Sequence, residues 1–383
     1  MTKLEELIQK LCPNGVEHKP LNEVSEMKRG TSITKKDIVE GEIPVVSGGR
    51  EPAYYCDKYN RDGETITVAG SGAGAGYVQY WTKPIFVCDA FSIQGNPGIQ
   101  TKYIYYFLTN IQDYIYSTKK GGGVPHVHIS SIENVSVPVP PLPVQREIVR
   151  ILDNFTELTA ELTAELTARK KQYAYYRDKL LSTNNSSVPV VELRDIVKKS
   201  CSGATPAKGN AEYYENGTIP WIRTQDVRFN EITEVNSYIT EKAVSETATK
   251  WIPENCVIVA ISGATAGRCA INKIKATTNQ HCLNLIIDDS MALYRYVFHC
   301  LCSKYEELIS RKQGARGDLN SSLILSLPIP IPSLEVQKRL VKVLDNFDAI
   351  CSDLKIGLPA EIEARQKQYE YYRDKLLTFT PAD

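Results

Sequence analysis

The sequence predicts an α+β fold in which two mixed α/β globular domains are separated by two long, antiparallel, coiled-coil-like helices. The most informative observation is that Arg169–Leu181 recurs as Arg365–Leu377, with eleven of thirteen residues identical. Apolar residues at helical spacing precede both copies, and strand-like, glycine-rich segments precede both helical blocks. Two copies of one long unit indicate a pseudo-two-fold internal duplication and not a short-period repeat.

The duplication divides the 383 residues into four blocks. Two mixed blocks are rich in Gly, Val, Tyr and Thr and are predicted to be globular domains. The other two blocks carry apolar residues at helical spacing, which form a stripe along one face of a helix. The predicted boundaries are 1–140 and 188–331 for the globular domains, and 141–182 and 332–378 for the helices. The polar segment Ser182–Pro189 is the best linker in the chain. The charged, amphipathic first residues predict a short helix and not a signal peptide.

The helical stripes predict a seam between the two long helices. Its central residues are expected to be Leu158, Leu162, Leu166, Ile350, Leu354 and Leu358. The second copy has four more residues than the first between its LDNF motif and the repeated end, and Gly357 and Pro359 fall there. We therefore expect a kink or break near that point. The first copy instead carries the tetrapeptide TAEL twice, at 159–162 and 163–166.

Composition excludes several classes of protein. Ten scattered cysteines without a CxxC motif indicate reduced, mostly buried thiols in a cytoplasmic protein, and we expect no metal site. No stretch approaches the eighteen apolar residues of a membrane helix. The 45 basic and 45 acidic residues give no net charge, which counts modestly against DNA binding. A DNA-binding surface must then arise from local clustering or from phosphate contacts supplied by partners.

The glycine-rich segment Gly70–Gly76 resembles a nucleotide-binding loop, but a strand-like stretch follows it where a phosphate site would need a helix. Its partial recurrence as Ser262–Gly267, with fewer glycines, favours a glycine turn between strands. No nucleophile, zinc-protease, Walker, methyltransferase or nuclease motif occurs. His126 and His128 would share one face of a strand, and a structural or DNA-facing pair is favoured there over a metal site. The sequence contains no catalytic site that we can identify.

Polar residues in the loops of both globular domains are candidates for reading bases, because Arg pairs with guanine and Gln with adenine. Two basic, glycine-containing loops at matching positions, 119–123 and 311–317, are the strongest of these. For any single residue, solvated surface charge is an equally good interpretation. The candidates are Arg50, Lys119, Lys120 and His126 in the first domain, and Arg223, Gln225, Arg268, Gln280, Lys312 and Arg316 in the second.

Taken together, these motifs resemble the specificity subunits of type I restriction–modification enzymes over nearly the full chain. The resemblance rests on the two KQYxYYRDKLL helix ends at 171–181 and 367–377, and on the helix starts at 137–155 and 327–347. The tandem TAEL is similar to the type IC-like subgroup, in which the number of repeats sets the spacing between two half-sites. Each motif is weak alone, and the combination is specific.

The resemblance implies that residues 1–140 and 188–331 are target-recognition domains, each reading half of a bipartite, asymmetric site in double-stranded DNA. It implies that 141–182 and 332–378 are spacer helices that dock two methyltransferase subunits, with restriction subunits joining the complex. Adenine methylation and DNA cleavage, with S-adenosylmethionine, ATP and Mg, are then expected on those partners. This chain would be cytoplasmic, without a membrane contact, a cofactor or catalysis of its own. Candidate docking residues are Tyr176, Arg177, Tyr372 and Arg373.

Two other classes of function remain open on the residues alone. One is a coiled-coil adaptor whose globular ends bind proteins, which the zero net charge supports. The other, less favoured, is an enzyme that binds a nucleotide at Gly70–Gly76. The bases read by each domain do not follow from the sequence, since loop side chains do not map to bases without a complex.

Overall fold

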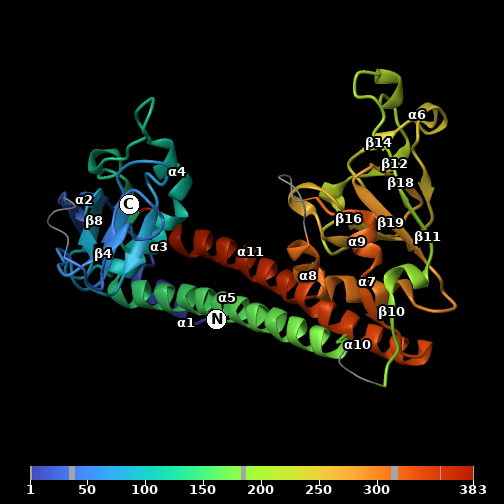
Figure 1. Ribbon diagram of the computed structural model, residues 1–383. Coiled ribbons are helices and arrows are strands. Elements are labelled where there is room, and N and C mark those ends of the chain that lie inside the picture. Colours follow the sequence, from blue (N-terminus) through green and yellow to red (C-terminus); the bar gives the residue numbers. More distant parts are fainter. Residues whose placement is uncertain (1, 34–38, 183–186, 312–317, 354, 383) are drawn as a thin grey trace. The chain divides into compact units, whose positions relative to one another are not determined.

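The computed structural model describes residues 2–33, 39–182, 187–311, 318–353 and 355–382. They form two compact units, the first made of Met1–Thr163 with Glu361–Asp383 and the second of Ala164–Ala360. Each unit contains one globular domain and a part of each helical block (Figure 1). The long helix α5, Leu142–Leu180, follows the first globular domain in the chain and precedes the second. Among the described residues, no helix combines the length and the apolar character needed to cross a bilayer.

In its described residues, the first globular domain is built from three sheets and a few short helices. Its strands are β1 His18–Pro20, β2 Ser25–Arg29, β3 Ile43–Val46, β4 Tyr54–Cys56, β5 Thr65–Ala69, β6 Val78–Trp81, β7 Phe86–Val87, β8 Ala90–Gly95 and β9 Ser136–Pro138. Its helices are α1 Lys3–Leu11, α2 Leu21–Val24, α3 Thr101–Asn110, α4 Gln112–Ser117 and the 3₁₀ turn η1 Ile129–Ser131. The short helix predicted at the N-terminus is α1, whose capping box joins Thr2 and Glu5.

The second globular domain has the same kinds of elements. Its strands are β10 Val190–Glu192, β11 Val197–Ser202, β12 Ile219–Ile222, β13 Glu231–Ile232, β14 Tyr238–Ile239, β15 Trp251–Ile252, β16 Val257–Ala260, β17 Cys269–Asn272, β18 Ala276–Thr278, β19 Cys282–Ile287 and β20 Pro328–Pro330. Its helices are α6 Glu241–Glu246, α7 Tyr294–Ser303, α8 Tyr305–Ser310 and α9 Ser321–Leu325. Four 3₁₀ turns accompany them: η2 Leu193–Ile196, η3 Ala211–Tyr213, η4 Thr224–Asp226 and η5 Gly263–Thr265.

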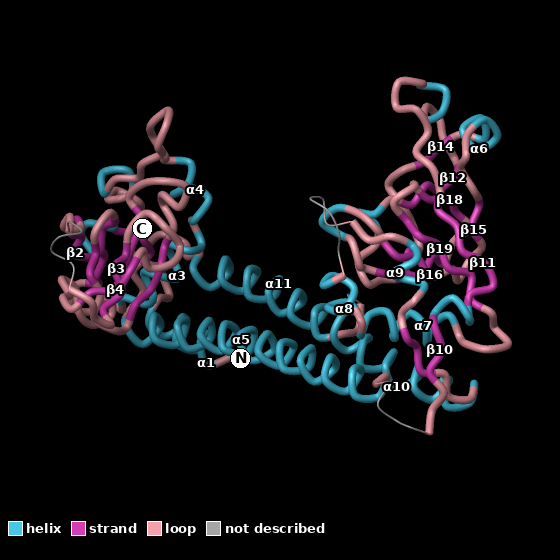
Figure 2. The backbone as a smooth tube through the Cα atoms, viewed as in Figure 1, coloured by secondary structure: helices cyan, strands magenta, loops and turns pink. Residues whose placement is uncertain are grey.

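The two domains share one strand topology (Figure 2). The sheet β2-β8-β5-β6 of the first corresponds to β11-β19-β16-β17 of the second, β4-β3-β7 corresponds to β14-β12-β18, and β1-β9 corresponds to β10-β20. The second domain adds β13 and β15 at sheet edges. The predicted duplication therefore extends through the globular domains, although their sequences have diverged.

A buried helix packs on the larger sheet in each domain, α3 in the first and α7 in the second. The tyrosine hydroxyls of these helices are satisfied in the same way. Tyr103 donates to the carbonyl of Pro138 at 3.0 Å, and Tyr296 donates to that of Pro330 at 2.8 Å. Because a buried hydroxyl needs a partner, this bond fixes each helix against the last strand of its domain.

The second helical block is broken where the sequence predicts. Helix α10, Leu334–Ser352, ends before Gly357, and α11, Leu358–Leu377, begins after it. A Cβ at Gly357 would lie 2.5 Å from the carbonyl oxygen of Ala349, so only glycine fits this close turn. The predicted linker Ser182–Pro189 lies partly outside the described residues.

The helical blocks pair in antiparallel order, which confirms that part of the predicted fold. In the first unit, Phe155 of α5 stacks on Tyr372 of α11, with ring centroids 5.5 Å apart. In the second unit, Tyr176 of α5 lies 6.3 Å from Phe347 of α10. An earlier residue of α5 thus contacts a later residue of the second block, and a later one contacts an earlier one. The pseudo-two-fold relation that the duplication predicts for the two globular domains stays a prediction.

The predicted seam is less buried than the leucine stripe indicates. Leu158 is 37% exposed and Ile350 is 45% exposed, which corrects the prediction that both lie at a buried centre. Leu162, Leu166 and Leu358 are half-buried, and Leu354 lies outside the described residues. Two helices paired without a third layer cover only a narrow stripe on each other, so residues beside that stripe remain in solvent.

Candidate nucleic-acid interface

The glycine loop of each domain is a turn between antiparallel strands. The amide of Gly76 donates to the carbonyl of Ala69 at 2.8 Å, and in the second domain Gly267 donates to Ala260 at 2.8 Å. Strand β6 follows the first loop and β17 the second. The predicted glycine turn is confirmed, and the helix N-terminus that a phosphate cradle would need is replaced by a strand in both domains.

A polar pocket of about 580 Å³ lies in the second domain, beside the end of β12. Two residues before Thr205, which lines the pocket, a Cβ at Gly203 would lie 1.8 Å from the carbonyl oxygen of Thr278, so a side chain is sterically excluded there. The walls combine three aromatic rings with amides, hydroxyls and cations. The lining residues are Thr205, Lys208, Tyr214, Trp221, Arg223, Asn236, Ser237, Tyr238, Asn279, Gln280 and His281.

The first domain has a smaller pocket, of about 310 Å³, which shares some of its lining positions with the larger one. Gly30 occupies the position of Gly203, and its Cβ would lie 2.0 Å from the carbonyl oxygen of Cys88. The lining residues are Arg29, Gly30, Ser32, Gly70, Cys88, Asp89, Ala90, Phe91, His126, Val127, His128 and Ile129. The rings of His126 and His128 stack, with centroids 6.0 Å apart, as expected of two histidines on one face.

Backbone hydrogen bonds establish which positions of the two pockets correspond. Cys88 donates to Val46 at 2.8 Å as Asn279 does to Ile222 at 3.0 Å, so Cys88 and Asn279 are equivalent. Gly70 donates to Asp89 at 3.0 Å as Ile261 does to His281 at 2.9 Å, so Asp89 is equivalent to His281.

One residue more separates Asn279 from His281 than separates Cys88 from Asp89, and that residue is Gln280. Its side-chain oxygen accepts a hydrogen bond from Thr205, while Asp89 accepts one from Ser71. The same framework therefore presents different polar groups in the two domains.

The structure brings most of the first-domain candidates to one cluster of loops. His126 pairs through its backbone with Lys120, and Ser71 of the glycine turn forms a bridge with His126. Lys119 lies over the ring of Tyr116 at 4.4 Å and Arg50 over that of Tyr77 at 5.0 Å. Tyr77 directly follows the glycine turn, so Arg50 lies beside the same loop.

The second-domain candidates are less concentrated. Arg223 and Gln280 line the polar pocket, and Gln225 is exposed in the turn that follows Arg223. Arg268 is half-buried at the end of the turn between β16 and β17. Lys312 and Arg316 lie outside the described residues. Leu319, which follows them in the chain, is equivalent to Val127, because its amide donates to Ile261 as that of Val127 does to Gly70.

The sequence did not single out several of the lining residues. They are Ser32, Asp89, Thr205, Lys208 and His281. Ser32 follows Gly30 by two positions, and Thr205 follows Gly203 by two positions. Aligning the two halves on Gly30 and Gly203 is the signal that locates them. Asp89 and His281 stand directly before the apolar strands β8 and β19. A polar residue next to an apolar run indicates that this end of the strand faces solvent.

The repeated helix ends are divided between core and surface. Tyr173 and Leu181 pack against the core of the second unit, and Tyr369 and Leu377 pack against the core of the first. Each end therefore packs on the globular domain of the other copy. The docking candidates Tyr176 and Tyr372 are 41% and 40% exposed; Tyr372 stacks on Phe155, and Tyr176 lies tilted against Phe347 of the paired helix.

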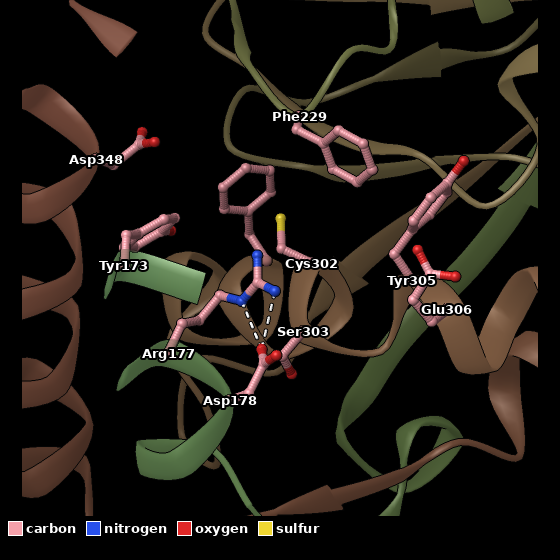
Figure 3. Close-up of a pocket in the computed structure, with 10 residues that line it drawn as sticks. Tyr173, Arg177, Asp178, Phe229, Cys302, Ser303, Tyr305, Glu306 and Asp348 are labelled. Carbon is pink, nitrogen blue, oxygen red and sulfur yellow. Dashed lines mark hydrogen bonds and ion pairs between the residues drawn. The ribbon is translucent and has the colours of Figure 1, made fainter. Parts of the chain in front are cut away.

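The arginines of the two ends have different partners. Arg373 donates to the side chain of Asn110 at 3.0 Å, whereas serine, Ser303, stands at the equivalent position of the second domain. There Arg177 donates to Asp178 at 2.9 Å and lies beside a cavity of about 240 Å³ (Figure 3). The guanidinium carbon lies 5.6 Å from the centroid of the Tyr173 ring, and Figure 3 shows the guanidinium beside the thiol of Cys302; both residues line the cavity.

A charge network anchors the LDNF motif in both units. Asp345 accepts from Arg295 at 2.8 Å and lies 2.7 Å from the ring nitrogen of His299. Burial would raise the pKa of Asp345, but the hydrogen bonds from His299 and Arg295 outweigh it and hold that pKa below its ordinary value. In the first unit Asp153 pairs with Lys102 at 2.8 Å. The carboxylate thus binds α3 or α7 to the start of a long helix.

All ten cysteines are free thiols, and most of them are buried, as predicted. Cys269 and Cys302 approach to 3.4 Å in the core of the second domain. Burial raises the pKa of the Cys256 and Cys282 thiols to about 12, so neither ionises near neutral pH. These groups behave as small apolar side chains and contribute to packing rather than to chemistry.

Comparison with known proteins agrees with this duplicated architecture. The family described as "Type I restriction modification DNA specificity domain" matches twice, at residues 13–169 and 185–364. The chain is 39% identical over 291 residues to the type I restriction enzyme EcoR124I/EcoR124II specificity subunit of Escherichia coli, an alignment that covers 73% of this chain and 70% of that protein. It is 29% identical to a putative specificity subunit of Haemophilus influenzae over 99% of both chains.

The fold is likewise similar to a solved structure. The type I restriction–modification S subunit from M. genitalium superposes with a TM-score of 0.61 at 18% identity, covering 94% of this chain and 96% of that one. The matches define the class as a DNA-recognition protein that is the non-catalytic part of a larger complex. The chain belongs to the family of type I restriction–modification specificity subunits.

Proposed function

We propose that this chain directs its complex to a bipartite, asymmetric site in double-stranded DNA. Each globular domain reads one half of the site, and the bases between the halves are not read. The helical blocks set the length of that gap. Residues 1–140 and 188–331 act as the two target-recognition domains, with 141–182 and 332–378 as the spacer.

The observation that carries this proposal is that equivalent positions line a polar pocket in each domain. Cys88 and Asp89 of the first pocket correspond to Asn279 and His281 of the second, and Gln280 is inserted between the latter two. A shared framework with different hydrogen-bonding groups is what two readers of different sequences require, because donors and acceptors at fixed positions select base edges. Two identical readers would instead favour a palindromic site.

The proposed partners supply the remaining activities. Two methyltransferase subunits dock on the helical blocks and bind S-adenosylmethionine, and restriction subunits use ATP and Mg. The complex acts in the cytoplasm. Because this chain has no net charge, the partners are also expected to provide many of the phosphate contacts that give affinity for DNA. Tyr175 and Tyr371 of the repeated ends are 61% and 62% exposed, and exposed aromatics of this kind anchor interfaces.

This division of labour predicts that the purified chain binds no S-adenosylmethionine or ATP. The glycine turns end in strands and lack the helix N-terminus that holds phosphate. Equilibrium dialysis of the chain alone with each radiolabelled compound measures this directly. Saturable binding of either compound at micromolar concentration would contradict the proposal and favour a nucleotide-binding enzyme.

Methylation mapping tests the proposal as a whole. The chain is expressed with its methyltransferase subunits in a host that lacks adenine methylation, and the host DNA is sequenced for modified adenines. The expected result is a single motif with two specific halves of different sequence and an unread gap. No chain-dependent methylation, or an uninterrupted palindrome, would contradict it. Omitting the chain while keeping the methyltransferase is the control.

A further inference from the structure

Arg223 lines the second-domain pocket without an acidic residue among the other described side chains that line it. It follows β12, and its backbone is fixed by two contacts with Asp226: its amide donates to the carboxylate at 2.8 Å and its carbonyl accepts from the Asp226 amide at 2.8 Å. The side chain therefore extends from a rigid turn. Its guanidinium lies 5.8 Å from the centroid of the Trp221 ring.

The side-chain Nε of Arg223 is buried and has no hydrogen-bond partner in the part of the chain that the structure describes. An unsatisfied buried donor costs about 1–3 kcal/mol, and a charged one costs more. Buried guanidinium groups are normally paired with carboxylates. Neither Asp nor Glu is among the described residues that line this pocket. Arg223 thus has no acidic partner among the described residues of the pocket, and a ligand from outside the domain can provide an acceptor for its terminal N–H groups.

The other lining groups indicate what that ligand offers. Lys208 and Arg223 are cationic, and the amides of Asn279 and Gln280 can each donate or accept. Such a pocket suits a ligand that presents acceptor atoms. The two acceptors on the major-groove edge of guanine, O6 and N7, match the two parallel N–H groups of an arginine.

The first domain differs at this position. Strands β3 and β12 are equivalent because each pairs in parallel with the strand that precedes the pocket loop, β7 or β18. Ser47 follows β3 where Arg223 follows β12. The pocket of the first domain also carries the carboxylate of Asp89. At the position that follows β3 or β12, a guanidinium is thus present only in the second domain, while Arg29 lines the first pocket from another strand.

We propose that Arg223 reads a guanine in the half-site of the second domain. The inference rests on the proposed function and adds to it one residue and one base. The terminal N–H groups of the guanidinium donate to guanine O6 and N7 in the major groove. Gln280 and Lys208 lie beside it and contact the same or the adjoining base pair.

Two substitutions test the inference in the assembled complex. Arg223→Gln removes the charge, and Arg223→Lys keeps the charge but not the planar fork that matches guanine. Arg194→Gln is the control, since Arg194 pairs with Glu192 at 2.7 Å away from the pocket. Thermal melting followed by circular dichroism verifies that each variant is folded. Methylation mapping then gives the motif of each complex.

The expected result is that both Arg223 variants lose preference for guanine at one position of one half-site. The other half-site, the gap and the control are unchanged. In gel shifts with duplexes that carry the wild-type motif, replacing this guanine by 7-deazaguanine should weaken wild-type binding about tenfold or more and leave the variants unaffected.

Three outcomes would overturn the inference. One is an unchanged motif in both variants. A second is an equal loss of affinity for all duplexes with a smaller salt dependence, because that result assigns Arg223 to a phosphate. A third is full retention of the guanine preference by Arg223→Lys. If the wild-type complex itself yields no bipartite motif, the proposed function has failed, which separates the two failures.

Discussion

Gln145 and Gln337 occupy the same position in the two copies and perform the same structural role. Both are almost fully buried. The oxygen of Gln145 accepts from the amide of Gln100 at 2.9 Å, and that of Gln337 accepts from Leu293 at 2.9 Å. Each amide group also donates to a proline carbonyl five residues earlier. One side chain therefore joins the start of a long helix to the start of the core helix.

Replacing Gln337 by Leu should lower the free energy of unfolding by about 1–3 kcal/mol, because it leaves a buried amide and a buried carbonyl unpaired while keeping the volume. Urea unfolding followed by circular dichroism measures the change. Gln172→Leu is the control, since Gln172 is exposed on α5. A stability equal to wild type in Gln337→Leu would show that the two bonds contribute nothing.

Glu147 gives the first unit a dependence on acid pH. Hydrogen bonds from Arg150, at 2.7 Å, and Lys3, at 3.0 Å, outweigh burial and lower the pKa of Glu147 to about 2. A carboxylate whose pKa is depressed on folding stabilises the protein above its ordinary value of 4.5, and this stabilisation is lost as the pH falls toward 2. Helix α1 carries Lys3 and is held to α5 by this pair.

The Glu147→Gln variant should therefore lose stability less steeply than wild type between about pH 4.5 and pH 2, because a neutral amide binds no proton in this range. At pH 7 the variant should be the less stable of the two. Midpoints of urea unfolding across this range measure both effects. Parallel curves for the two proteins would contradict the assignment.

At the scale of elements, the repeated helix ends exchange partners between the copies. Phe155 of the first LDNF contacts Tyr372 of the second repeat, and Phe347 of the second LDNF contacts Tyr176 of the first. Duplicated helices that pair with each other in antiparallel order produce this reciprocal pattern. The same pattern explains why the two helix ends have remained nearly identical to each other in sequence, since each end must fit both a helix and a globular core.

The cavity beside Arg177 makes that end a candidate for docking a partner. Arg177→Glu should weaken the binding of one methyltransferase subunit, because it reverses the charge beside a cavity that Asp178 and Asp348 also line. The partner would then meet a surface that is more negative than in the wild type. Native mass spectrometry of the assembled complex counts the bound subunits. The charge-matched control is Arg169→Glu, on the same helix. Unaltered assembly with an intact fold would indicate that Arg177 only closes the helix onto the second domain.

For the whole molecule, the sequence was sufficient for the architecture but not for the site. The recurrence of Arg169–Leu181 and the stripes before it predicted the helices, and Gly357 predicted the break between α10 and α11. Burial in the seam was overestimated at Leu158 and Ile350, because a stripe shows which face is apolar and not how much of it a partner covers.

The pockets were only partly predictable for a different reason. Arg223, Gln280 and His126 were candidates because of their side-chain chemistry alone. Thr205 and Asp89 reach the pockets through pairing of strands distant in the sequence, which no local pattern reveals. The single-residue insertion at Gln280 emerges only when backbone hydrogen bonds align the two domains.

The TAEL repeats allow a direct test of whether the helices set the distance between the two half-sites. Thr159 donates to the carbonyl of Phe155 and Thr163 to that of Thr159, each four residues earlier, so one repeat is about one helical turn with its own bonds. Inserting a further TAEL after Leu166 adds about 6 Å of helix. The added turn nearly preserves the apolar stripe, so the fold should survive.

Methylation mapping of this insertion variant, expressed with its methyltransferase subunits, measures the two half-sites and the gap together. If the domains read the bases and the helices set their separation, both half-sites remain as in wild type. The unread gap then lengthens by about one to two base pairs, since the added turn is about 6 Å long and base pairs rise about 3.4 Å each. Altered half-sites with an unchanged gap would contradict the account.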